Sequence, residues 1–234
     1  MSGASQAPRS QILCPPTIQR CLDERKTTIL SPRLGMRLGA IALPLQVESV
    51  VDSTNRVAWE QVRDRQTEWV VVAAEQRSGR GQWGRSWHSA PGGLYLSLAV
   101  QPSCPLARAT QLTLCSSWGI VQALRSLDIP AQIKWPNDVV LEGRKLAGIL
   151  TETRSQQGAI AQAVIGVGLN WDNPVPDFGV ALRSWLLNTS HPAVRQLPSL
   201  NSVAALILWG LWGGYCACQD DELAALLPDY DQCL

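Results

Sequence analysis

One glycine- and arginine-rich segment, residues 79–93, constrains this chain more than any other stretch. It reads GRGQWGRSWHSAPGG and lies between two apolar runs, residues 69–76 and 94–101, that are typical of buried strands. Glycines let the backbone approach a ligand closely, and arginine offers a planar charged fork that fits phosphate. Tryptophan stacks on heterocycles and excludes water. The segment therefore predicts a loop between two strands that binds a flat, anionic ligand.

Gly79, Gly81 and Gly84 have the spacing of the dinucleotide-binding fingerprint, but their context excludes that interpretation. The fingerprint requires a helix to begin at the glycine loop. Here a second strand, residues 94–101, follows the segment instead. The remaining alternative is a mobile surface loop without a ligand.

Length, charge and cysteine usage exclude several classes of protein. At 234 residues and 46% apolar content, the chain is long enough for one domain with a large core. Twenty basic residues balance nineteen acidic ones, so the net charge of +1 gives no general attraction to nucleic acid or a membrane surface. The seven cysteines include no CxxC pair, which favours free thiols and a cytoplasmic location.

The hydrophobic pattern predicts an α+β fold with a mixed sheet, because strand-like and helix-like segments do not alternate strictly. Strands are expected at residues 41–51, 69–76, 94–101, 132–138, 139–152 and 160–170, and the fifth of these segments could form a hairpin around Glu142 and Gly143. Helices are expected at residues 52–64, 107–127, 202–218 and 220–227. Residues 171–200 are rich in proline and read as loops.

Two segments are harder to interpret. Residues 1–40 hold four prolines and no clear period, so we expect a poorly organised lead-in before one domain at residues 41–234. Residues 196–219 carry no charge, so they are either a membrane anchor or a buried helix that begins near Asn201 or Ser202. The three glycines and the short apolar run favour the buried helix.

Three further clusters point to a site. KWPND (134–138) ends a strand in a turn, and Lys145 follows on an apolar strand with small neighbours, where its ammonium is predicted to meet a carboxylate or phosphate in a cavity. Gly166 and Gly168 interrupt another strand, which marks either a β-bulge or the close approach of a ligand. DSTN (52–55) reads as a helix N-terminus, which also donates hydrogen bonds.

Several catalytic motifs are absent from the sequence. It contains no Ser-His-Asp order, no HExxH, no GxxxxGK[ST] loop and no credible His/Cys metal cluster. Covalent catalysis by the protein is therefore not expected. The catalytic mechanisms that remain are positioning of the reactants and electrostatic stabilisation of a reaction at a phosphoester or mixed anhydride.

In their order and spacing, the clusters at 52–55, 79–93, 134–152 and 166–170 resemble the biotin–protein ligases over residues 46–172. The resemblance implies the monofunctional type, without the N-terminal DNA-binding domain. It implies a mixed, largely antiparallel central sheet with helices packed on one face. It also implies that biotin and ATP, with Mg²⁺, give biotinyl-5′-AMP and pyrophosphate. Biotin would then pass to a lysine of the biotin carboxyl carrier protein of acetyl-CoA carboxylase. A homodimer is compatible with the resemblance, whereas nucleic-acid and membrane partners are not expected.

The same resemblance assigns roles to individual residues. Lys145 and Arg80 would be catalytic, and no protein ligand for a metal is expected. Biotin would be bound by Ser53, Thr54, Gln76, Gly79, Arg80, Lys145, Gly166 and Gly168. ATP and the adenylate would be bound by Arg80, Gln82, Arg85, Trp87, Lys134, Asn137 and Asn170.

The chain departs from the family pattern at three places. Gln82 stands where the family usually has the third basic residue of GRGRxGR, which predicts early release of the adenylate. The sequence ends at Asp231–Leu234, where the family's small C-terminal barrel-like domain would begin, so that domain is expected to be absent. The helix at 202–218 is more apolar than expected, which predicts either an exposed patch or an oligomer contact.

Three alternatives remain open. A lipoate or octanoate ligase of the same fold is the first, although the polar residues Ser53, Thr54 and Gln76 suit the ureido group of biotin better than a dithiolane. A protein that binds biotinyl-adenylate without transferring it is the second, and Gln82 favours it. A protein-interaction module that uses a tryptophan-rich surface is the third.

Overall fold

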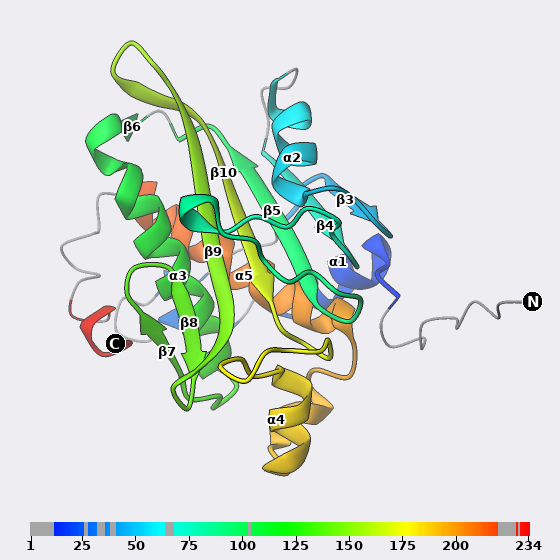
Figure 1. Cartoon of the computed structure of the whole chain (residues 1–234). Coiled ribbons are helices and arrows are strands. Elements are labelled where there is room, and N and C mark those ends of the chain that lie inside the picture. Colours follow the sequence, from blue (N-terminus) through cyan, green and yellow to red (C-terminus); the bar gives the residue numbers. More distant parts are fainter. Residues whose placement is uncertain are drawn as a thin grey trace, which may run out of the picture.

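A mixed sheet organises the fold of this computed structural model (Figure 1). The structure describes residues 12–25, 28–31, 36–37, 41–63, 68–102, 104–219, 228 and 230–234. The sheet has eight strands in the order β3-β4-β5-β10-β9-β8-β7, with β6 paired beside β10. Their bounds are β3 Leu45–Glu48, β4 Trp69–Ala73, β5 Leu94–Val100, β6 Cys104–Pro105, β7 Ala131–Lys134, β8 Asp138–Leu141, β9 Arg144–Gln156 and β10 Ala159–Leu169. A separate antiparallel pair joins β1 (Ile29–Ser31) to β2 (Met36–Arg37).

The pairing of the strands confirms the predicted sheet. Only β3 and β4 run parallel among the described strands, and the other pairs are antiparallel. The hairpin between β8 and β9 turns at Glu142 and Gly143, whose φ angles are 51° and 75°. Positive φ at both central residues is the conformation of a two-residue type I′ turn, which glycine adopts without steric cost.

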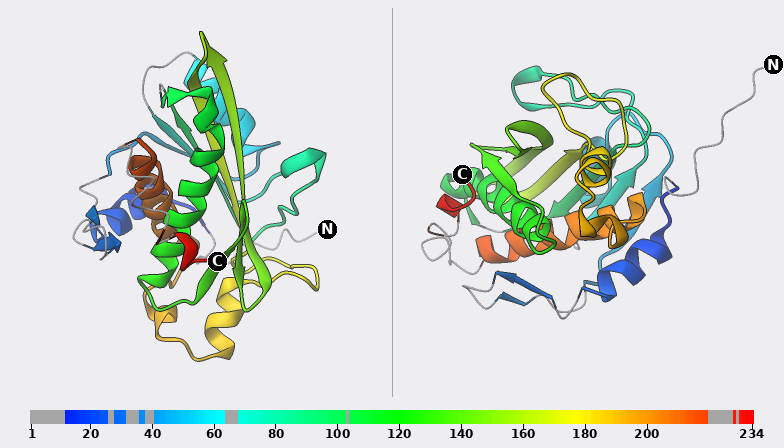
Figure 2. Two further views of the ribbon diagram at one scale, coloured as in Figure 1. Left: turned by 90° about the vertical axis from the view of Figure 1, so that its left-hand side faces the viewer. Right: turned by 90° about the horizontal axis from the view of Figure 1, so that it is seen from below.

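Helices lie on both faces of the sheet. Helix α3 (Ala109–Arg125) and α5 (Leu200–Gln219) pack on one face, and α1 (Pro15–Asp23) packs against α5. Helix α2 (Thr54–Arg63) packs on the opposite face, over Val71, Ala99 and Val164. Figure 2 shows α3 and α5 on one side of the sheet and the 79–93 segment on the other. The prediction of helices on one face therefore holds for most of them, with α2 as the exception. Short helical segments complete the chain: α4 Leu182–Asn188, η2 Gln82–Gly84, η3 Leu106–Arg108 and η4 Pro192–Arg195.

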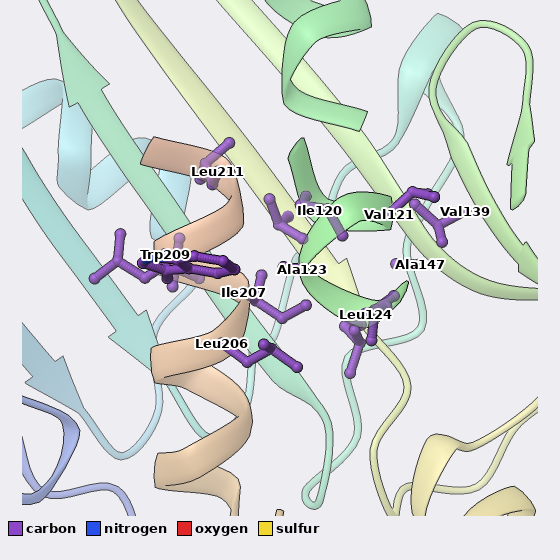
Figure 3. Packing of buried hydrophobic residues seen from close by; sticks show 14 of the residues in the cluster. Ile120, Val121, Ala123, Leu124, Val139, Ala147, Leu206, Ile207, Trp209 and Leu211 are labelled. Atoms are coloured by element: carbon purple, nitrogen blue, oxygen red, sulfur yellow. The ribbon is translucent and has the colours of Figure 1, made fainter. Parts of the chain in front are cut away.

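The main core lies between the sheet and the α3/α5 layer (Figure 3). Ile120 and Leu124 of α3 face Ile207 of α5, and all three are fully buried. The two helices approach closely because glycines meet at their crossing. A Cβ on Gly119 would collide with the backbone of Gly210, and one on Gly214 would collide with the backbone of Cys115. The core thus forms a rigid support behind the sheet.

The structure corrects three expectations. Part of the predicted lead-in is helix α1, in which Ile18 and Leu22 are buried, because its prolines occupy the first helical turn where no N–H is required. The predicted loops after residue 171 contain helix α4. Helix α5 is neither an exposed patch nor an oligomer contact, because it is buried along almost its whole length.

Alone among the described helices, α5 is long and apolar enough to cross a membrane by length and composition, and it occupies the position of a core helix. The helix predicted at 220–227 lies outside the described residues.

Candidate active site

The face of the sheet opposite α3 and α5 carries small and polar residues at its centre. Side chains alternate between the faces of a strand, so residues paired across strands share a face. On this face Ser97 of β5 lies opposite Gly166 of β10, and Gly168 lies opposite Gly148 of β9. A cavity of about 780 Å³ lies above the sheet on this face.

The cavity collects nearly all of the predicted site residues. The 79–93 segment covers it, α2 begins at one end, and the KWPND turn and residues 176–179 form the other end. The lining includes Ser53, Thr54, Gln76, Arg80, Gln82, Arg85, Trp87, Lys134, Asn137, Lys145, Gly166, Gly168 and Asn170. Gly79 is not part of the lining. A Cβ at Gly79 would collide with Ser89 and lie 2.7 Å from the Trp87 carbonyl, so this glycine lets the loop fold back on itself.

One end of the cavity is a chain of hydrogen bonds between neutral polar groups. The Thr54 backbone N–H and hydroxyl both donate to Oε1 of Gln76, at 2.8 and 3.1 Å. The Gln76 amide nitrogen donates to Ser89 Oγ at 2.9 Å, and Ser89 Oγ lies 3.2 Å from the Trp87 carbonyl oxygen. The chain joins the start of α2 to the glycine-rich segment. Its amide and hydroxyl groups can both donate hydrogen bonds to a ligand and accept them from it.

The ammonium of Lys145 enters the cavity as predicted and meets a carboxylate. Lys145 Nζ lies 2.7 Å from Asp138 Oδ1 and 5.2 Å from the centroid of the Trp87 ring. Both charged side chains are largely shielded, with 29% and 22% of their surfaces exposed. The backbone of Lys145 is also fixed, because its N–H donates to the Phe178 carbonyl and its carbonyl accepts from the Val180 N–H. The ammonium is therefore held in place before any ligand enters.

The guanidinium of Arg80 pairs with a carboxylate on β9. Its Nη2 lies 3.1 Å from both carboxylate oxygens of Glu152. Asn55 Nδ2 and Trp59 Nε1 also donate to Glu152 Oε2, at 2.8 and 3.3 Å. Arg80 lines the cavity, but its charge is partly neutralised by this pair.

The two strand glycines make room for side chains of the protein itself. A Cβ on Gly166 would collide with the amide of Asn55, and one on Gly168 would collide with the indole of Trp87. Gly148 also faces this indole, since its Cβ would lie 2.9 Å from Cζ3 of Trp87. A ligand that lies against Gly168 must therefore displace Trp87. The indole Nε1 of Trp87 is buried and has no hydrogen-bond partner among the described residues.

Other predicted residues fall into two groups. Asn137 and Asn170 support the backbone: Asn137 Nδ2 donates to the Ile149 carbonyl at 3.0 Å, and Asn170 Nδ2 donates to the Lys145 carbonyl at 3.3 Å. Arg85 and Lys134 line the cavity, and neither makes an ion pair with a described residue. These two cations are available for an anionic ligand.

Sequence reasoning missed several residues of the site. Ser97 is fully buried and lies within hydrogen-bonding distance of Thr54 Oγ1 and Asn55 Oδ1, at 2.8 and 2.7 Å. A lone serine inside the apolar run LYLSLAV was the available signal. Asp138 and Glu152 were also missed, although both belong to the quoted motifs. Trp83, Trp135 and Phe178 are exposed aromatics in the cavity lining, with 90%, 66% and 68% of their surfaces exposed.

Tyr95 anchors the far end of the glycine-rich segment. Its hydroxyl donates to the Ala90 carbonyl at 2.6 Å, and burial raises its pKa well above the usual value. A Cβ on Gly93 would collide with the Tyr95 ring, so this glycine lets the segment pass. The phenol therefore stays protonated and keeps donating.

Comparison with known proteins identifies the family. The model of the biotin/lipoate A/B protein ligase family matches residues 47–170, more than half of the chain. The chain belongs to this family. It is 32% identical over 179 residues to the bifunctional ligase/repressor BirA of Bacillus subtilis, covering 75% of this chain and 55% of the relative. It is 35% identical over 131 residues to the biotin–[acetyl-CoA-carboxylase] ligase of Paracoccus denitrificans, covering 55% and 54%. The chain thus spans about half the length of these relatives.

Solved structures of family members share the fold. The biotin protein ligase of Leishmania major in complex with biotinyl-5-AMP superimposes with a TM-score of 0.63 at 21% identity, over 83% of this chain and 82% of that one. The Aquifex aeolicus ligase in complex with biotin and ATP gives a TM-score of 0.61 at 23% identity, over 82% and 78%. The predicted α+β fold with its mixed, largely antiparallel sheet is therefore confirmed.

Proposed function

We propose that this member of the family is an ATP-dependent biotin–protein ligase, which forms biotinyl-5′-AMP and transfers biotin to a lysine of a biotin carboxyl carrier protein. One observation carries the proposal. Four segments that are distant in the sequence line a single cavity, with neutral polar groups at one end and cationic groups at the other. Its volume of about 780 Å³ is within the usual range for cofactor-sized ligands.

The polar end suits a ureido ring. A ureido group has two N–H donors and one carbonyl acceptor. Ser53, Thr54 and Gln76 of the cavity lining supply matching amide and hydroxyl groups, and Ser89 accepts a hydrogen bond from Gln76 behind them. A dithiolane ring has neither N–H donors nor a carbonyl acceptor, so it would gain no hydrogen bonds from this end of the cavity. This favours biotin over lipoate or octanoate.

The cationic end suits a carboxylate beside a triphosphate. In the first step a biotin carboxylate oxygen would attack the α-phosphorus and form a P–O bond. The bond from the α-phosphorus to the oxygen that bridges to the β-phosphate would break, and pyrophosphate would leave with that electron pair. Lys145 would neutralise charge near the reacting oxygens, while Arg85 and Lys134 would hold the phosphates. No group of three or more metal-ligating side chains occurs among the described residues. Asp138 is the one carboxylate of the described cavity lining, so Mg²⁺ would be carried chiefly by the phosphates and would offset their charge.

In the second step a neutral lysine amine of the carrier would attack the acyl carbon. The C–N bond would form, the bond between the acyl carbon and the phosphate oxygen would break, AMP would leave with the electron pair, and the amine nitrogen would lose a proton to solvent. The 79–93 segment would exclude water from the mixed anhydride until then. The carrier protein of acetyl-CoA carboxylase is the proposed acceptor, because two relatives are biotin–[acetyl-CoA-carboxylase] ligases. We propose that the protein acts in the cytoplasm, since all seven cysteines are free thiols.

Biotin-dependent exchange of pyrophosphate into ATP tests the first step. We expect exchange with biotin and none with lipoate. Lys145→Ala should abolish exchange while biotin still binds, because the lysine acts on the reacting oxygens and the polar end is unchanged. Arg56→Gln is the matched control, since Arg56 is an exposed cation of α2 outside the cavity. Exchange that persists in Lys145→Ala would contradict this role.

Transfer to a carrier domain tests the second step. A protein that binds the adenylate without transferring it is the competing function, and Gln82 in place of an arginine favours it. Exchange without labelling of a carrier would establish that alternative. Exchange with lipoate in place of biotin would establish the lipoate ligase.

A further inference from the structure

Glu152 lies at the centre of a cluster that no role in the reaction yet explains. It is on β9 and faces the same side of the sheet as Gly148, just beyond the strand residues that line the cavity. Arg80 of the glycine-rich segment, Asn55 of α2 and Trp59 of α2 all donate to its carboxylate, at distances of 2.8 to 3.3 Å. In Figure 1 the glycine-rich segment crosses in front of β9, so Glu152 joins this segment to the sheet.

The cluster favours a carboxylate at this position, because Arg80 reaches both of its oxygens. All three neighbours present N–H groups, and an ionised carboxylate is an acceptor only. In a glutamine, an NH₂ group would replace one of the two carboxylate oxygens. At least one of its N–H groups would then face an N–H of a neighbour, and no hydrogen bond could form there. The side chain of Glu152 is 26% exposed, so water replaces lost partners only in part. The ring of Trp59 is fixed on its other side by Arg154, whose guanidinium carbon lies 4.1 Å from the ring centroid.

The orientation of Asn55 connects this cluster to the polar end of the cavity. Its Nδ2 faces two acceptors, Glu152 Oε2 and the Leu150 carbonyl, so its Oδ1 must face the Ser97 hydroxyl. Ser97 also lies 2.8 Å from Thr54 Oγ1, and Thr54 donates to Gln76. Glu152 is therefore bonded to the glycine-rich segment directly and, through α2, to the residues proposed to bind the vitamin.

We propose that Glu152 is a positioning residue, which holds Arg80 and thereby fixes the Gly79–Gly84 turn over the cavity before a ligand enters. The inference deepens the proposed function and rests on it for the effect on substrates. A segment that is already fixed loses less conformational entropy on binding, so ligand affinity rises. Arg80 then contributes chiefly through the position of its backbone, while Lys145, Arg85 and Lys134 supply the charge.

Hydrogen–deuterium exchange of the ligand-free protein tests the positioning role without any assay of activity. The amides of Gly81 and Trp87 are bonded within the segment, to the carbonyls of Arg85 and Gly79 at 2.7 and 2.9 Å. In Glu152→Gln, we expect these amides to exchange about fivefold faster, the size expected for a partly exposed ion pair. Amides of β5 should keep their exchange rates, because β5 lies inside the sheet. Glu60→Gln, on the exposed side of α2, is the matched control.

Arg80→Met separates this role from a general effect on folding. It removes the link to the segment but leaves Glu152 with Asn55 and Trp59. We expect the same acceleration in Arg80→Met as in Glu152→Gln, and no further increase in the double variant. Unchanged exchange in Arg80→Met, or additive effects in the double variant, would overturn the proposal even if Glu152→Gln fails to fold.

The kinetic prediction concerns the split between KM and kcat. In pyrophosphate exchange, Glu152→Gln should raise the KM for biotin about fivefold and leave kcat nearly unchanged, because the segment must then be ordered by the ligand. A loss confined to kcat would contradict the positioning role. If the wild-type protein shows no exchange activity, the proposed function fails, while the deuterium-exchange comparison still decides whether Glu152 holds the segment.

Discussion

Substitution of Gly166 by alanine tests how the site is built. The new Cβ would collide with Oδ1 of Asn55 and lie 2.9 Å from its Cγ and 3.1 Å from its Nδ2. The amide must therefore move and lose its bonds to Ser97 and Glu152, which are 2.7 and 2.8 Å long. A neutral bond contributes about 1 kcal/mol and a bond to a charged group about 1.5–3 kcal/mol. Glu152 keeps two other donors and some solvent, so we take the lower value for its bond.

The loss of these bonds amounts to about 2.5 kcal/mol. Alanine recovers roughly 0.5 kcal/mol relative to glycine inside a strand. We expect Gly166→Ala to lower the free energy of unfolding by about 2 kcal/mol, and the urea midpoint by about 0.8 M for a slope of about 2.5 kcal/mol/M. Urea titration followed by circular dichroism measures this.

A double-mutant cycle with Asn55→Ala decides whether the reasoning is correct. Asn55→Ala removes the amide with which the Cβ of Gly166→Ala would collide. In that background Gly166→Ala should therefore leave the free energy of unfolding unchanged or raise it slightly. The coupling should be about 2 kcal/mol or more. If Gly166→Ala costs about 2 kcal/mol in both backgrounds, the collision with Asn55 is not the cause and the argument fails.

Three other outcomes follow from the structure. Gln82→Arg should slow the release of labelled adenylate, because it adds a cation to the cavity lining, and an unchanged off-rate would contradict this. Burial raises the pKa of Tyr95 above its ordinary value of 10.0, so stability should be constant below about pH 10 and fall as the pH rises above it. A flat unfolding profile up to pH 12 would argue against this. Iodoacetamide should modify Cys14 before Cys115, as found by peptide mass spectrometry. A hydrogen bond from Thr17 lowers the pKa of Cys14, whereas a neighbouring thiol and burial raise that of Cys115.

Local patterns in the sequence were sufficient for most of the sheet. Strands β4 and β5 are short apolar runs between polar segments, and the turn at Glu142 and Gly143 has the residue types of a tight hairpin. The chemical motifs could also be found locally. That they line one cavity could be predicted only from their resemblance to a family. Lys145 entered the cavity as expected from its small neighbours.

Other elements depended on context that the local pattern does not carry. Pro15 and Pro16 suggested broken structure, but at the start of α1 they occupy positions where proline is favoured. For the strongly apolar α5, the prediction of a buried helix is confirmed. The prediction of an exposed patch is wrong, because its partners α3, β5 and α1 could not be assigned to its surface beforehand. Burial on all sides accounts for its composition.

The glycines of β10 show where inference from sequence ends. A glycine inside a strand indicates that something approaches the backbone, but it does not indicate what. The resemblance favoured biotin at both positions, whereas the structure places Asn55 against Gly166 and Trp87 against Gly168. Asn55 of α2 and its acceptor Glu152 of β9 are 97 residues apart, and they meet because α2 packs on the sheet and the register of β5, β10 and β9 places Glu152 beneath it. Since a shift of one residue in that register would turn these side chains to the opposite face, the site depends on the sheet as a whole.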